Sequence, residues 1–249
     1  MKSLLTFTVL AAAILGFATH SLAAAIVVYS DDFTDGLNSS LNGQAPQVRP
    51  TTETWAAGNW TKNTSGDGTV THGGGTSSAV LPAPSFNPGD IFVMTTRLFN
   101  DTTGSGWTAT GFTTGTTTGF NSPNVGMYWM LWRGNDELRA LENGASFVGP
   151  SVVVAGENNQ LDARIVFDVD ENTMTWFYKN PSATDWIQLH SMTPLASRIA
   201  SINNLGLSAN TGSAGAISFE FTNAIPEPGT ALLCALGLLT LLGRRRRLP

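Results

Sequence analysis

Segments in which apolar and polar residues alternate constrain the fold of this chain most. From Leu161 to Asp170, Leu161, Ala163, Ile165, Phe167 and Val169 are apolar, and most residues between them are charged. A period of two is typical of a β-strand with one face buried and the other in water. In an amphipathic helix the apolar residues would recur every three or four positions. The pattern therefore predicts a strand.

The same alternation, or a short continuous run of apolar residues, predicts strands along most of the body. They are expected at 27–33, 91–99, 125–132, 137–141, 173–179, 186–192 and 217–222. Gly134-Asn135-Asp136 predicts a hairpin turn, and residues 195–202 could form at most a short helix. No repeat of fixed length indicates a propeller or a solenoid. We therefore expect an all-β domain at 24–225, a two-sheet antiparallel jelly-roll β-sandwich.

Residues 1–23 have the features of a signal peptide. Lys2 precedes an apolar run, and Ser21-Leu22-Ala23 places small residues where signal peptidase cleaves. An uncleaved anchor helix is the alternative, although the run is short for a membrane span. We expect a signal helix that exports the chain and is removed by signal peptidase.

Residues 226–249 form a tail with three parts. They are the motif Pro226, Glu227, Pro228, an apolar segment at about 229–243, and a basic end, 244–249, with Arg244, Arg245, Arg246 and Arg247. The two prolines keep the motif out of helices and sheets, and so accessible to an enzyme. Arginines after an apolar helix stop its transfer and stay cytoplasmic. The tail therefore predicts a transmembrane helix with the body outside the cytoplasmic membrane.

This tail resembles the PEP-CTERM sorting domain of Gram-negative bacteria, and the resemblance covers the tail alone. It implies that Pro226, Glu227 and Pro228 are recognised by an exosortase, a membrane-embedded cysteine transpeptidase. The protein would then be held transiently in the inner membrane before it reaches the cell surface or the extracellular matrix. An ordinary C-terminal membrane anchor is the alternative reading.

Three short motifs in the body resemble the concanavalin A-like lectin/glucanase superfamily, in its laminin-G-like branch. They are Ser30-Asp31-Asp32-Phe33, Phe86-Asn87-Pro88-Gly89-Asp90 and Gly206-Leu207-Ser208-Ala209-Asn210. The resemblance spans about residues 28–222 and implies a jelly-roll sandwich in which the first and last strands lie side by side.

Composition excludes several functions. Residues 24–225 carry 8 basic and 17 acidic side chains, a net charge of −9, which argues against a nucleic-acid partner. The single cysteine, Cys234, lies in the tail, so the body has no disulfide, thiol nucleophile or cysteine zinc site.

No catalytic arrangement is visible in the sequence. Glucanases of the superfamily carry two carboxylates about 5 Å apart on one strand. Asp168-Val169-Asp170-Glu171 enters a turn, and Glu137 and Glu142 have the wrong spacing to share a strand face. His72, expected in a loop, and His190, expected on a strand, have no nucleophile motif beside them. We therefore expect no enzyme activity.

Two ligand hypotheses remain. Asp31, Asp32 and Asp35 could hold a calcium ion, and no other cofactor or metal is expected. Trp107, Trp129 and Trp132 could stack on sugar rings, although Trp129 and Trp132 fall on opposite faces of one strand, so at least one belongs to the core. The Gly- and Thr-rich stretch 102–124 is the expected ligand-facing loop region.

The sequence thus predicts an exported surface or matrix protein, non-catalytic and able to bind a polysaccharide. An atypical glycan hydrolase with carboxylates from different strands, or a purely structural matrix component, are the alternatives.

Overall fold

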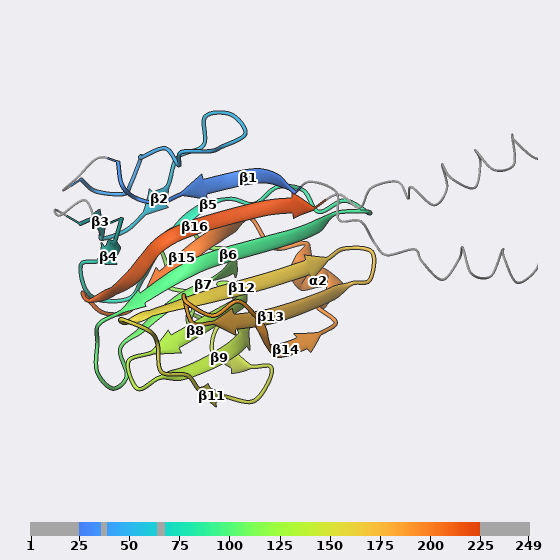
Figure 1. Cartoon of the computed structure of the whole chain (residues 1–249). Coiled ribbons are helices and arrows are strands. Elements are labelled where there is room, and N and C mark those ends of the chain that lie inside the picture. The colour runs from blue at the N-terminus through green and yellow to red at the C-terminus, as the bar shows by residue number, and fades with distance from the viewer. Residues whose placement is uncertain (1–24, 36–38, 64–67, 225–249) are drawn as a thin grey trace, which may run out of the picture. The chain divides into compact units, whose positions relative to one another are not determined.

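The computed structural model describes residues 25–35, 39–63 and 68–224. The compact unit Ile26–Asn223 is a sandwich of two antiparallel β-sheets (Figure 1). The predicted signal segment 1–23 and the sorting tail 226–249, with the helices expected in each, lie outside the described residues. Within the described part of the chain, no helix is long and apolar enough to cross a membrane.

The first sheet contains the first and the last strand of the sandwich in sequence order. Its strands are β1 (Ile26–Asp31), β3 (Trp60–Lys62), β4 (Val70–His72), β6 (Ile91–Asn100), β12 (Gln160–Asp168), β13 (Thr173–Lys179), β14 (Ile187–Met192) and β16 (Ala214–Ala224). The order is β14-β13-β12-β6-β16-β4-β3, and β1 also pairs with β16. Because Ile26 pairs with Asn223, the first and last strands lie side by side, as expected.

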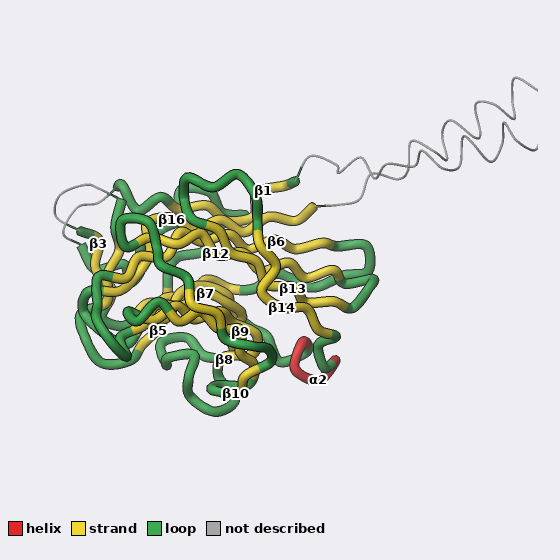
Figure 2. Tube along the Cα trace, turned by 60° about the horizontal axis from the view of Figure 1, so that its bottom comes forward, coloured by secondary structure: helices red, strands yellow, loops and turns green. Residues whose placement is uncertain are grey.

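The second sheet forms the other layer. Its strands are β2 (Ala56–Ala57), β5 (Ser77–Pro82), β7 (Trp107–Thr113), β8 (Gly126–Arg133), β9 (Glu137–Glu142), β10 (Ser146–Phe147), β11 (Val152–Val153) and β15 (Asn204–Ala209). The order is β10-β9-β8-β7-β15-β5-β2, and β11 also pairs with β9. Figure 2 shows the two layers, with the single-turn helix α2 (Ala196–Ile199) at one end of the molecule.

The main core lies between the sheets. On β12, Leu161, Ile165 and Phe167 are at most 2% exposed, as their alternation predicts. On β16, Phe219 and Phe221 also face this core, and the Phe221 ring stacks on Phe92 of β6 with centroids 5.4 Å apart. Burial of these large apolar side chains is the main force that holds the layers together.

In the sequence, Ile217, Phe219 and Phe221 alternate with polar residues, which predicts that all three face the core, and for Ile217 this prediction is wrong. Ile217 is only half-buried, whereas Ala216 and Phe219 on the same strand are fully buried. Ala216 and Phe219 are three positions apart, so the inward-facing residues are even-numbered before this point of the strand and odd-numbered after it. A strict period of two, counted back from Phe221, therefore places Ile217 on the wrong face.

The expected loop region 102–124 contains a central strand instead. β7 lies between β8 and β15 in the second sheet, and all seven of its residues are buried. Its sequence, Trp-Thr-Ala-Thr-Gly-Phe-Thr, contains no charged residue, as suits a strand that is covered on both faces. A strand buried on both sides shows no alternation between apolar and charged residues, which is why composition alone indicated a loop.

Candidate functional site

A second, smaller apolar cluster covers the outer face of the second sheet. On β8, Tyr128, Met130 and Trp132 face the main core, while Trp129 and Leu131 face outward. The outward residues cluster with Trp107 and Ala109 of β7, Leu141 of β9, Val80 of β5 and Phe120 of the β7–β8 loop. An apolar cluster on the outer face of a sandwich sheet is unusual, because such faces normally carry polar residues.

On this outer face, residues that pair across neighbouring strands form rows perpendicular to the strands. One row runs across Gly111, Trp129, Leu141 and Phe147, from β7 to β10. The next contains Ala109, Leu131 and Arg139, and a third pairs Trp107 with Arg133. Glycine is needed in the first row, because a Cβ at Gly111 would lie 2.4 Å from the Trp129 Cβ. The large indole ring therefore has space beside β7.

The rows form a groove of about 150 Å³. It is lined by Trp107, Asn121, Trp129, Leu131, Arg133, Arg139, Leu141, Ala145 and Phe147. Trp107 and Trp129, with ring centroids 5.8 Å apart, lie at its base and are 5% and 0% exposed. Phe147, at 58% exposed, forms an accessible wall. The groove therefore combines an apolar base with polar and charged groups.

Two arginines line this groove, and both are ion-paired with Glu137. Arg133 Nη1 donates to Glu137 Oε2 over 3.0 Å, and Arg139 Nη2 donates to the other oxygen, Oε1. The Arg139 guanidinium also lies over the Phe147 ring, 4.2 Å from its centroid, within the range of a cation–π contact. All three ionic side chains are partly exposed, so a ligand can reach them.

The structure separates the three candidate tryptophans. It brings Trp107 and Trp129 together under the groove, whereas Trp132 lies in the main core and is 2% exposed. The Trp132 Nε1 donates to the Val154 carbonyl, 3.2 Å away, so this ring has no face for a ligand. The expectation that Trp129 and Trp132 lie on opposite faces is confirmed.

Sequence reasoning missed Phe147 and the two groove arginines. The sequence carried a signal for the two arginines. Arg133 lies two positions after the outward Leu131 on β8, and Arg139 lies two positions before the outward Leu141 on β9, so alternation puts both on the outer face. Phe147 carried no such signal, since β10 is a two-residue edge strand.

The acidic residues considered for catalysis have structural partners. Glu137 lies between two arginines, and Glu142 forms an ion pair with Arg198. Asp168 Oδ1 accepts the Glu171 N–H, and Asp170 Oδ1 accepts the Gly89 N–H, as expected for residues in a turn. Their arrangement therefore serves ion pairs and turns.

The expectation that His72 lies in a loop is wrong, because His72 is the last residue of strand β4. His72 pairs with Trp60 of β3, is 1% exposed, and its ring centroid lies 5.6 Å from that of Trp60. Burial lowers the pKa of His72 below its ordinary value. The side chain therefore belongs to the core, whereas His190 lies on strand β14, as expected.

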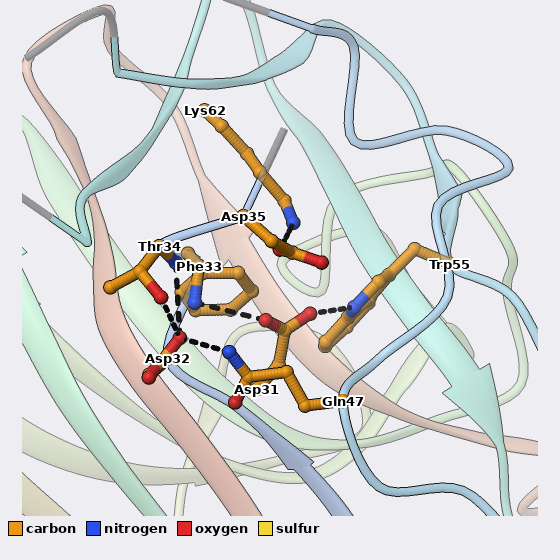
Figure 3. A network of polar contacts seen from close by, with 8 residues as sticks. All are labelled: Asp31, Asp32, Phe33, Thr34, Asp35, Gln47, Trp55 and Lys62. Atoms are coloured by element: carbon orange, nitrogen blue, oxygen red, sulfur yellow. Dashed lines mark hydrogen bonds and ion pairs between the residues drawn. The ribbon is translucent and has the colours of Figure 1, made fainter. Parts of the chain in front are cut away.

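The acidic residues proposed for calcium belong to a network of protein hydrogen bonds (Figure 3). Asp31 is 1% exposed and accepts the Phe33 N–H at 2.9 Å and the Trp55 Nε1–H at 2.8 Å. Burial raises the pKa of Asp31, and these two donors oppose the shift. Asp32 is exposed and accepts from Thr34 and Gln47.

Asp35 has a different partner, the ammonium group of Lys62. The Lys62 side chain is 0% exposed, while that of Asp35 is 56% exposed. The three carboxylates thus bind separate donors, and no three His, Cys, Asp or Glu side chains within the described ranges come together as metal ligands.

No protein-family model and no curated protein sequence matches this chain. Many solved structures resemble it in fold, and two lectins are examples. Lectin I from Ulex europaeus, in complex with the methyl glycoside of α-L-fucose, is 12% identical, with a TM-score of 0.52 over 82% of this chain and 99% of the lectin. Lectin II from Ulex europaeus gives the same identity, coverage and TM-score. The chain therefore shares the fold of these two lectins.

Proposed function

We propose that this protein is a non-catalytic carbohydrate-binding module that uses the groove on the outer face of the second sheet. The observation that carries the proposal is the apolar base of Trp107, Trp129 and Leu131 beside accessible polar groups. The likeness in fold to lectins supports it.

The chemistry of the groove suits a sugar ring. One face of a pyranose presents C–H groups that pack on apolar and aromatic side chains, while its hydroxyls need hydrogen-bond partners. Phe147 and Leu131 offer the apolar contacts, and the Asn121 amide and the arginine N–H groups offer polar ones. A groove of about 150 Å³ is small beside most ligand pockets, so it accommodates one ring of a longer glycan.

The test is glycan binding by the full chain, kept in solution with a zwitterionic detergent that carries no sugar. We expect binding to at least one class on a glycan array and a loss of about tenfold in affinity for Phe147→Ala, because the variant removes the accessible aromatic wall. Val153→Ala is the matched control, since Val153 is 82% exposed and lies on β11, outside the groove.

Three results would argue against this assignment. Binding to no glycan would favour a structural matrix component. Glycan cleavage lost on a carboxylate substitution would favour the hydrolase alternative. Equal losses for Phe147→Ala and Val153→Ala would place the ligand elsewhere.

We further propose that the protein is exported and then sorted by an exosortase. The support is in the sequence: a signal segment at one end, and Pro226-Glu227-Pro228 before an apolar run and four arginines at the other. The body would then act at the cell surface or in the extracellular matrix, with the tail as a transient anchor.

Removal of the tail is the expected outcome of sorting. In the final surface fraction of the native host, intact-mass measurement should find a product without Arg244, Arg245, Arg246 and Arg247. Changing Glu227 to alanine should leave the precursor in the membrane if the motif is recognised. An intact C-terminus in the surface fraction would contradict the proposal.

A further inference from the structure

We propose that the groove selects sugars that carry a carboxylate, such as uronic acid residues, over neutral sugars. This inference rests on the proposed carbohydrate-binding function and assigns the chemical class of its ligand. It is carried by Arg133 and Arg139, which share one acidic partner beside the apolar base.

The local charge is opposite to that of the domain. Glu137 is the acidic partner of both Arg133 and Arg139, so these three side chains have a net charge of +1. The remainder of residues 24–225 is strongly acidic, with 17 acidic and 8 basic residues in the whole segment. A position with net positive charge attracts anions locally, while the negative charge of the rest of the domain disfavours anions elsewhere on its surface.

The two arginines retain donors for a second carboxylate. A guanidinium has five N–H groups in a planar fork that matches the two oxygens of a carboxylate. The hydrogen bonds to Glu137 use Nη1 of Arg133 and Nη2 of Arg139. In the part of the chain that the structure describes, Nε of each arginine is buried and has no partner, so the donors left for a ligand are the second Nη groups of these two partly exposed side chains. Glu137 already demonstrates that a carboxylate can lie between these two side chains.

Strand register places these donors beside the apolar surface. Arg139 pairs with Leu131 across β8 and β9, and Arg133 pairs with Trp107 across β7 and β8. Arg139 is also stacked on Phe147, which holds its guanidinium plane at the wall of the groove. A sugar ring on Leu131 and Phe147 would therefore have its substituents within the reach of an arginine. A carboxylated sugar would use both the apolar surface and the positive charge of the arginines, whereas a neutral sugar would use mainly the apolar surface.

The test compares a carboxylated ligand with its neutral methyl ester, which has the same sugar rings. We expect the full chain, in the same zwitterionic detergent, to bind trigalacturonate about tenfold or more tightly than its methyl ester in calorimetry, because charge-assisted hydrogen bonds are stronger than neutral ones. The difference should shrink as salt is raised, since the arginines are partly exposed.

Variants locate the effect. Arg139→Gln should lower the affinity for the acid much more than the affinity for the methyl ester, and so remove most of the preference for the acid. Arg139→Lys should retain part of it, because the charge stays but the planar fork is lost. Arg49→Gln, an exposed arginine outside the groove, is the charge-matched control and should keep the preference.

Each other outcome has a distinct meaning. Equal binding of acid and ester, with loss on Phe147→Ala, would overturn the carboxylate preference and leave the carbohydrate-binding function intact. Equal affinity for a sulfated dextran oligosaccharide of the same charge would show that the groove accepts any anion, which overturns the carboxylate assignment. Binding to none of these ligands or to any array glycan would overturn both proposals.

Discussion

Phe219→Ala should lower the free energy of unfolding by about 3 to 5 kcal/mol, whereas Glu220→Ala should leave it nearly unchanged. Phe219 is 1% exposed on β16, the strand that pairs with β1, β4 and β6, and its ring lies edge-on to Trp55 with centroids 5.4 Å apart. Truncation removes the buried ring and leaves a cavity that the two rigid sheets cannot close.

Glu220 is a close control because it is the next residue on the same strand and faces solvent. Urea unfolding of the full chain, followed by tryptophan fluorescence, measures both changes. Similar effects for the two variants would show that the register of β16 is incorrect, since a slip of one residue exchanges the buried and exposed faces.

Asp31→Ala should lower the free energy of unfolding by about 2 to 5 kcal/mol, while Asp32→Ala should cost less than about 1 kcal/mol. The first variant leaves the buried Phe33 N–H and Trp55 Nε1–H without their acceptor (Figure 3). Each unsatisfied buried donor carries a desolvation penalty, because water cannot replace the lost carboxylate.

Asp32 accepts three protein hydrogen bonds, one more than Asp31, but it is exposed, so water can take its place. The two variants therefore have the same chemistry at adjacent positions and differ in burial. The same unfolding experiment compares them. A loss of stability in Asp32→Ala equal to that in Asp31→Ala would mean that the network depends on the number of hydrogen bonds rather than on their burial.

Eight of the sixteen strands that the structure describes could be predicted from the sequence, because each of them is encoded locally. Leu161, Ile165 and Phe167 are buried on β12 as their alternation indicates, and the turn at Gly134-Asn135-Asp136 joins β8 to β9. Asp136 has a φ of 66°, which aspartate tolerates better than most residues. The likeness of the motifs to a concanavalin A-like sandwich also gave the correct pairing of β1 with β16.

The sequence by itself determined eight of the strands that the structure describes and, for most of these, which face is apolar, because these properties depend on neighbours along the chain. The tertiary structure alone decided that both faces of β7 are buried, and that Trp107, Arg139 and Phe147 line one groove. These residues are distant in sequence and meet through the order and register of four strands. Such pairing depends on long-range contacts, which a local period of two cannot specify.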